Sequence, residues 1–246
     1  MRRRYALISV VVTLFVAACA SAPETRKNYN YDLGLSALAA ADYINAIAQL
    51  QEAAKASPDD PEVWNALGLA YFGRGLPDRA IQSFRKAIEL KSDYSEAWNN
   101  LGAVYLELGQ YESALSSCQK ALENILYAHP ENAWFNIGMV YFNTGKYKEA
   151  LDAFSRAVRI NPNFCDARYQ VGETWLQLGD AEKAVQAQRT VIQLCPDAVD
   201  PYLGAGIAYL KLGKRKTARQ YFDKVIELAP ESAQANDARR YLKLLR

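Results

Sequence analysis

The chain has 246 residues and a net charge of +2, and half of its residues are hydrophobic. This length and composition exclude a disordered chain and allow a sizeable core. The chain contains one histidine, His129, which excludes a multi-histidine metal site and a conventional histidine triad elsewhere in the chain. It has no glycine-rich loop of the kind that binds the phosphates of a nucleotide. We therefore expect no enzyme activity, no cofactor and no metal ion.

Residues 1–18 are typical of a bacterial export signal. Three consecutive arginines precede an apolar run from Tyr5, and small residues stand before Cys19. The alternative is an uncleaved membrane helix, but the run to Ala18 is about fourteen residues long, and a spanning helix needs roughly 20. Cleavage before Cys19 would remove the three arginines and leave a net charge of −1.

The residues that end this segment, Val16-Ala17-Ala18-Cys19, look like a lipobox. That resemblance implies a diacylglycerol on the Cys19 sulfur and a third acyl chain on the new amine, which together keep a protein on a membrane. By resemblance to Gram-negative lipoproteins, Ala20 after the lipidated cysteine implies the outer membrane, with the folded part facing the periplasm. Residues 19–27 are short and polar and predict a flexible tether.

After the tether, the sequence repeats with a period of thirty-four residues. The recurring positions are Trp64, Leu67, Gly68, Tyr71, Ala80, Phe84 and Ala87 in one unit and Trp98, Leu101, Gly102, Tyr105, Ala114, Cys118 and Ala121 in the next. Self-similarity at this period predicts a helical solenoid. The pattern resembles the tetratricopeptide repeat family, which implies pairs of antiparallel helices that pack closely at small residues.

This resemblance implies an all-α protein, a right-handed superhelix of six repeats with a C-terminal capping helix, over residues 28–246. The repeats are predicted at about 27–60, 61–94, 95–130, 131–164, 165–198 and 199–232. Apolar residues at helical spacing predict the capping helix over 233–246, because stacking leaves the last face uncovered. Gln188 stands where other repeats have phenylalanine. The third repeat carries two extra residues between Asn124 and Pro130, which lengthen either its second helix or the turn after it.

Three cysteines remain besides the lipidated one. Cys165 opens the fifth repeat and Cys195 closes it, and antiparallel helices bring the two ends of a hairpin together, so this pair could form a disulfide in an oxidising periplasm. The alternative is a pair of reduced cysteines that pack. Cys118 takes the place of a repeat phenylalanine and is predicted to be a buried, inert thiol. His129 is predicted to be a solvated turn residue.

In the tetratricopeptide repeat family, the first helix of each unit lines a concave groove. The residues at the facing positions, here called the predicted groove, are Tyr31, Leu35, Asn65, Leu69, Phe72, Asn99, Leu106, Phe135, Met139, Phe142, Tyr169, Glu173, Leu176, Leu203 and Ile207. This set suits the apolar side chains of an extended or helical protein segment, with Asn65 and Asn99 able to bond its backbone. Some members could instead be half-buried between helices.

The predicted groove also excludes several partners. It lacks the Lys and Arg cluster by which chaperone-binding members of the family clamp a terminal carboxylate, and it lacks the basic stripe that nucleic acid requires. We expect a protein partner, membrane contact through the N-terminal lipid, and neither nucleic acid nor a small-molecule substrate.

The lipobox, the six repeats, the capping helix and the insertion Leu126-Tyr127-Ala128-His129-Pro130 together resemble the type IV pilus biogenesis lipoproteins, the group of PilF, PilW and Tgl. Members act as pilotins, which help the outer-membrane secretin reach its membrane and assemble into a ring. The resemblance implies that this chain binds the secretin through the predicted groove and promotes its outer-membrane localisation and multimerisation. The alternative is a periplasmic lipoprotein adaptor that scaffolds peptidoglycan enzymes or outer-membrane protein assembly factors, because it would share every feature above.

Overall fold

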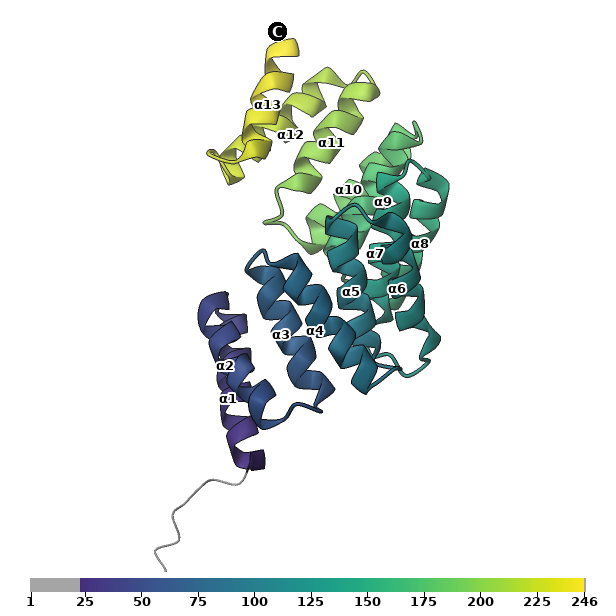
Figure 1. The fold of residues 1–246 in the computed structure, drawn as a ribbon. Helices are drawn as coiled ribbons and strands as arrows, with labels where there is room; N and C mark the ends of the chain where they lie inside the picture. Colours follow the sequence, from purple (N-terminus) through teal and green to yellow (C-terminus); the bar gives the residue numbers. More distant parts are fainter. Residues whose placement is uncertain (1–22, 246) are drawn as a thin grey trace, which may run out of the picture.

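The structure, a computed structural model, describes the backbone of residues 23–245 and the side chains of residues 29–245. The predicted export signal and Cys19 lie outside the described residues. Within them the chain forms thirteen α-helices and no strand, as antiparallel hairpins that stack in chain order (Figure 1). The hairpins are α1 (Pro23–Ala39) with α2 (Tyr43–Ala56), α3 (Pro61–Gly73) with α4 (Pro77–Leu90), α5 (Ser95–Glu107) with α6 (Tyr111–Glu123), α7 (Pro130–Asn143) with α8 (Tyr147–Ile160), α9 (Cys165–Gln177) with α10 (Ala181–Leu194) and α11 (Asp200–Lys211) with α12 (Arg215–Leu228), followed by α13 (Ala233–Leu244). The predicted all-α solenoid of six repeats is confirmed.

Each hairpin turns at a residue whose backbone lies in the left-handed region. The first hairpin uses Ala41, with φ 56°. The other five use glycine, which has no Cβ to clash in this conformation. These glycines, with φ between 69° and 85°, are Gly75, Gly109, Gly145, Gly179 and Gly213. The sequence therefore encodes the turns with the same period as the helices.

Within a hairpin, a glycine on the first helix admits a large side chain from the second. A Cβ built on Gly138 would lie 2.5 Å from the ring of Phe154, and one on Gly68 would lie 2.6 Å from the ring of Phe84. Both phenylalanines are fully buried, so one ring fills each close approach of two helices. In the third hairpin Cys118 takes this place and is fully buried, and burial raises the pKa of its thiol to about 12, as expected of an inert cysteine.

In most first helices, a side chain near the start of the helix donates a hydrogen bond to a backbone carbonyl in the turn before it. The indole of Trp64 donates to the carbonyl of Pro58 over 2.7 Å. The side chains of Trp98, Arg168 and Tyr202 each donate to a carbonyl six residues earlier in the same way. Because these carbonyls lie outside the helices, the bonds give them a partner and fix each hairpin against the turn that enters it.

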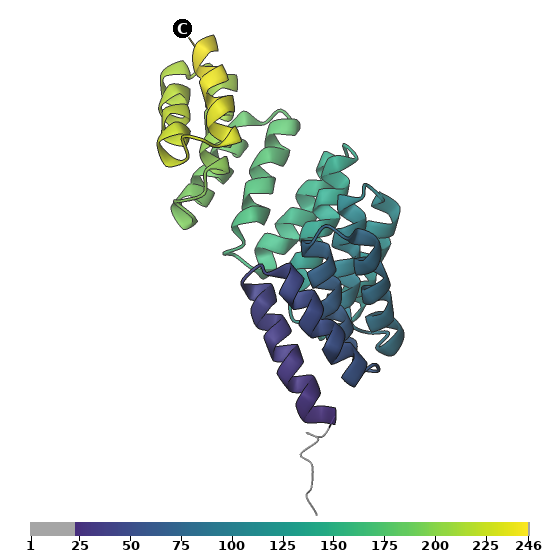
Figure 2. The same ribbon diagram turned by 60° about the vertical axis from the view of Figure 1, so that its left-hand side comes forward.

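The last helix, α13, covers the open face of the sixth hairpin. In Figure 2 it lies against α11 and α12 at the end of the curved stack. The Tyr241 ring stacks on Phe222, with centroids 5.0 Å apart and an interplanar angle of 6°. Arg215 donates to the carbonyl of Leu244 over 3.1 Å, which satisfies one of the open carbonyls at the helix end. The predicted capping helix is confirmed.

Two predicted boundaries differ from the structure. The predicted tether 19–27 is too long, because α1 begins at Pro23 and takes in its last residues. The extra residues of the third repeat lengthen the turn and not the helix, because α6 ends at Glu123 and α7 begins at Pro130. Among the described residues, no helix combines the length and the apolar character that crossing a bilayer requires.

Candidate partner-binding groove

The first helices of successive hairpins line the inner side of the solenoid. α1 contacts α3, α3 contacts α5, α5 contacts α7 and α9 contacts α11, while each second helix packs on the first helices beside it. Every member of the predicted groove lies on one of these first helices. The repeat pattern therefore placed the set on a common side of the molecule.

The members of the predicted groove differ in exposure. Leu35 is 39% exposed, whereas Asn99 and Leu176 are 8% and 5% exposed. The other members are half-buried. The half-buried apolar members that pack on buried core clusters are Tyr31, Leu69, Phe72, Leu106, Leu203 and Ile207. Asn99 and Leu176 are covered by neighbouring helices and offer no contact surface, so their place in the predicted groove is corrected.

The amides of the predicted groove bond to the solenoid itself. The Nδ2 group of Asn100 donates to Asn65 Oδ1 over 3.0 Å, and that of Asn136 donates to Asn99 Oδ1 over 2.9 Å. The first bond joins α3 to α5, and the second joins α5 to α7. The Oδ1 atoms of Asn65 and Asn99, which were expected to be able to bond a partner's backbone, therefore each already accept a hydrogen bond within the chain. The amides instead fix the spacing of three inner helices.

The aromatic members on α7 contact other rings of the chain. The centroid of Phe135 lies 5.7 Å from that of Phe154 and 5.2 Å from that of Phe164, just before α9. Phe142 lies 5.5 Å from Tyr147 at the start of α8. Because each ring is half-buried by these contacts, only its outer part is open to a partner.

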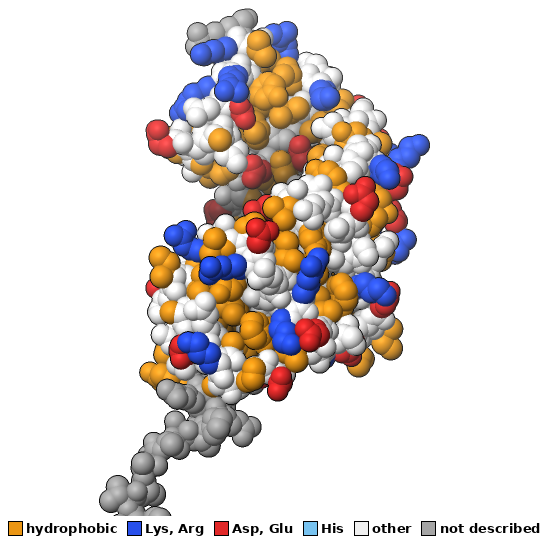
Figure 3. Space-filling view, viewed as in Figure 1, with side chains coloured by type: hydrophobic (Ala, Val, Ile, Leu, Met, Phe, Trp, Pro, Cys, Tyr) orange, Lys and Arg blue, Asp and Glu red, His pale blue; other side chains and the backbone are white. Residues whose placement is uncertain are grey.

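A polar cluster interrupts the inner side at the fifth hairpin. Gln188, in place of the repeat phenylalanine, is fully buried and donates from Nε2 to Glu173 Oε1 over 2.9 Å. Burial and then the charge of Asp200 raise the pKa of Glu173 to about 7, against the lowering effect of the Gln188 bond. Burial, followed by the same two carboxylates, also raises the pKa of Tyr169. Figure 3 shows acidic side chains around the hollow where the lobe of α11–α13 meets the preceding hairpins. The only sign of this cluster in the sequence is Gln188, which stands where other repeats have phenylalanine.

Replacing Glu173 with Gln should remove a pH dependence of stability. The pKa in the folded protein, about 7, lies above the ordinary value of 4.5, so folding favours the protonated form. The stability that protonated Glu173 contributes to the folded protein is fully present below pH 4.5 and is lost as the pH rises through about 7. We expect the Glu173→Gln variant to be more stable than the wild type above that pH, by about 3 kcal/mol.

The measurement is urea unfolding of the two proteins across this pH range. The exposed Glu107 on α5 offers the matched control, Glu107→Gln. Equal pH slopes for wild type and Glu173→Gln would contradict the proposed burial effect.

A large cleft lies away from the predicted groove, between α6, α7 and α8. It has a volume of about 630 Å³, and Trp134 and Tyr141 line it. The Arg156 guanidinium lies 4.6 Å from the Trp134 ring centroid, and its Nε donates to Asp152 over 2.9 Å. A second cleft, of about 440 Å³, has an equivalent place between α4, α5 and α6. These clefts recur with the hairpins and follow from the stacking of second helices, and no member of the predicted groove lines either one.

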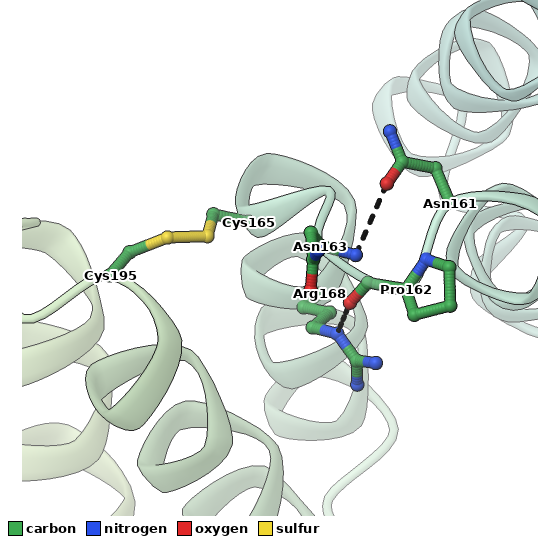
Figure 4. The surroundings of a disulfide bond; sticks show 6 residues. All are labelled: Asn161, Pro162, Asn163, Cys165, Arg168 and Cys195. Carbon is green, nitrogen blue, oxygen red and sulfur yellow. Dashed lines mark hydrogen bonds between the residues drawn. A yellow bond between two sulfur atoms is a disulfide. The ribbon is translucent and has the colours of Figure 1, made fainter.

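The predicted cysteine pair is bonded. Cys165 begins α9 and Cys195 directly follows α10, with 6.6 Å between their Cα atoms (Figure 4). The turn before α9 is ordered beside this bond, because Arg168 Nε donates to the carbonyl of Pro162 over 2.6 Å. The disulfide therefore closes the open end of the fifth hairpin.

His129 lies in the lengthened turn before α7. Its side chain is 63% exposed, and Nδ1 is 3.6 Å from Glu131 Oε1. The predicted solvated turn residue is thus confirmed. Within residues 29–245, no group of three histidine, cysteine or acidic side chains is placed to hold a metal ion.

Comparison with known proteins supports this architecture. Models described as tetratricopeptide repeat match residues 31–95 and 135–199, residues 93–163 and residues 199–232. No curated protein matches the sequence. Among solved structures, the chain is similar to PilW, a widely conserved type IV pilus biogenesis factor, with a TM-score of 0.80 and 23% identity over 86% of this chain and 97% of that one.

Two further structures extend the comparison. PilF of Pseudomonas aeruginosa has a TM-score of 0.77 and 21% identity over 89% of this chain and 99% of its own. YrrB, a TPR protein with an unusual peptide-binding site, has a TM-score of 0.59 and 25% identity over 78% of this chain and 97% of its own. At these identities, PilW and PilF share a fold with this chain along nearly their whole length.

Proposed function

The chain belongs to the tetratricopeptide repeat family, and on that premise we propose that it is an outer-membrane lipoprotein that binds the type IV pilus secretin through the inner side of its solenoid. Binding promotes the outer-membrane localisation and multimerisation of the secretin. The supporting observation is the match in fold with PilW and PilF, which covers 97% and 99% of those chains. Members of this family bind other proteins and need no covalent chemistry to do so.

The lipid anchor supplies the physical basis of this function. Acyl chains on Cys19 would keep the solenoid at the membrane where the secretin must assemble. A partner segment bound to the solenoid would then be present at a high effective concentration beside other bound segments. Multimerisation follows from this concentration and requires no catalytic group.

The inner surface suits an apolar partner segment. Leu35 on α1 is exposed, and the apolar members on α3, which contacts α1, and on α5, which contacts α3, are half-buried. Partly open apolar side chains on adjacent helices can accept the apolar face of a helical or extended segment. With the Asn65 and Asn99 oxygens already bonded, apolar contact carries the interaction.

Replacing Leu35 with Glu should weaken capture of the secretin by about tenfold or more, because a charge would be buried in an apolar interface. The fold should tolerate the change, since Leu35 is exposed. The matched control is Ile44→Glu, which places the same charge at a 68% exposed residue at the start of α2, a second helix. Crosslinking and pull-down from solubilised outer membranes measures the capture. Equal capture by both variants would contradict the proposal that the secretin binds to the inner side of the solenoid.

Deletion of the whole protein distinguishes the two functional hypotheses. Loss of secretin multimers with normal general outer-membrane proteins is the result expected of a pilotin. The reverse result would favour the adaptor that scaffolds peptidoglycan enzymes or outer-membrane protein assembly factors.

A further inference from the structure

The turn between α6 and α7 differs from every other turn between hairpins. It spans six residues, 124–129, whereas the turns after α2, α4, α8 and α12 span four and the turn after α10 spans five. Ile125 is 95% exposed and Leu126 is 84% exposed. Exposing two adjacent aliphatic side chains to this degree is unfavourable in water, so the pair is expected to have an apolar partner.

The turn is ordered despite its exposed tip. Asn124 Nδ2 donates to the carbonyl of Asp93 over 3.1 Å, and the Leu126 amide donates to Asn124 Oδ1 over 2.9 Å. Tyr127 is buried at 8% and belongs to the core cluster that contains Cys118. These contacts hold the turn in shape on both sides of the aliphatic pair, so the two side chains project from a rigid base.

The fold places this turn on the same edge of the solenoid as the start of α1. The helices run antiparallel in chain order, so α2, α4 and α6 all end on the edge where α1 begins. Figure 1 shows the first residues of α1 at the lower edge, with the turns after these helices along that edge. Figure 3, in the same view, shows hydrophobic side chains at this lower edge. Cys19 lies only four residues before Pro23, the first residue of α1.

We propose that the turn after α6 inserts Ile125 and Leu126 into the phospholipid bilayer to which Cys19 anchors the chain. The inference rests on the lipid anchor of the proposed function. A bilayer is favoured as the partner because a chain of four residues keeps this edge near the membrane, and two projecting aliphatic side chains can enter the region between the head groups and the acyl chains. Tyr29, on the first turns of α1 and 66% exposed, suits the same boundary.

A second contact with the bilayer would fix the orientation of the solenoid. A lipid at one point allows the protein to rotate about its attachment. A second point two hairpins further along holds the whole edge against the membrane and directs the opposite edge, with the turns at Gly75 and Gly109, away from it. The inner surface is then presented to a partner in a constant direction.

The test uses the full lipidated chain with Ala128→Cys, labelled with an environment-sensitive fluorophore. Ala128 is exposed beside the aliphatic pair. The label is selective because Cys118 is buried and Cys165 is bonded to Cys195. The control is Leu108→Cys, in the same hairpin repeat but on the opposite edge, between α5 and α6. Vesicles of phosphatidylethanolamine and phosphatidylglycerol carry a nitroxide lipid as the quencher.

We expect fluorescence at position 128 to shift to the blue and to be quenched several-fold more than at position 108. Adding Ile125→Ser and Leu126→Ser should abolish the difference. Equal quenching at the two positions overturns the proposal. So does loss of secretin capture by the serine variant without quenching at position 128, which would identify a protein as the occupant.

Failure of the anchor is read separately. If the wild type does not sediment with vesicles any more than Cys19→Ser does, the lipid anchor is wrong. The labelled Cys19→Ser chain mixed with the same vesicles then reports the turn alone. Preferential quenching at position 128 supports insertion, and its absence overturns it.

Discussion

Replacing Phe154 with Ala should lower the free energy of unfolding by about 3–5 kcal/mol, the cost of removing a buried phenylalanine and leaving a cavity. The ring is fully buried, and a Cβ on Gly138 would lie 2.5 Å from it. Since the glycine has no side chain, nothing on the facing helix can fill the space. The centroid of Phe135 also lies 5.7 Å away, so the groove residue loses part of its support.

The matched control for this prediction is Phe142→Ala, which removes the same side chain from the same hairpin. Phe142 is half-buried, so its loss should cost clearly less. Urea unfolding of the three proteins measures the difference. Equal free energies of unfolding for the two variants would show that the packing of Phe154 against Gly138 does not contribute specially to the stability of the hairpin.

Removing the disulfide with Cys165→Ser and Cys195→Ser should lower the free energy of unfolding by about 3–4 kcal/mol. The two cysteines are 30 residues apart in sequence, and closing a loop of about this size restricts the unfolded chain by that amount in the chain-entropy model. The fifth hairpin needs this support more than its neighbours, because Gln188 replaces its central phenylalanine and its Oε1 atom has no hydrogen-bond partner within the described residues.

Urea unfolding with and without a reductant measures this effect. The reductant should destabilise the wild type and leave the double variant unchanged, which separates the disulfide from the loss of two side chains. Hydrogen exchange should locate the extra opening in α9 and α10. A wild type with the same stability in reductant would contradict the prediction.

The two stability predictions also bear on function. Phe154 supports an inner-surface ring, and the disulfide closes the hairpin that carries Glu173 and Tyr169. Loss of either could therefore reduce partner capture without any change in the contact residues. Capture by these variants must be compared at temperatures where hydrogen exchange shows the solenoid folded.

The sequence predicted the architecture because the contacts within a hairpin recur at fixed spacing. Gly138 and Phe154 face each other within the fourth repeat, and Cys165 and Cys195 are bonded within the fifth. The two partners of each contact therefore lie in the same repeat. Such contacts follow once two antiparallel helices are assigned. The extra residues at 124–130 were visible for the same reason, although the repeat did not show whether they extend a helix or a turn.

The exposure of individual groove residues could not be predicted in this way. Asn99 is bonded to Asn136 of the next repeat, and Glu173 is buried against Gln188 and Asp200 from two other helices. The Asn99–Asn136 hydrogen bond and the effect of Asp200 on Glu173 cross between repeats and depend on the angle between hairpins, which no single repeat determines. Gln188 lies in the same hairpin as Glu173. The exposure of Ile125 and Leu126 likewise depends on the tertiary structure, in which Tyr127 of the same turn is buried and these two residues are not.

By itself, the sequence determined the six hairpins and the capping helix, because each depends on a period that is read along one chain. It placed Cys165 and Cys195 at the two ends of one hairpin but left open whether they are bonded. Only the tertiary structure decided which inner side chains remain open, how Glu173 acquires a raised pKa, and which edge carries an exposed apolar turn. The physical reason is that burial and desolvation depend on atoms contributed by several repeats, whereas hairpin formation depends on residues within one.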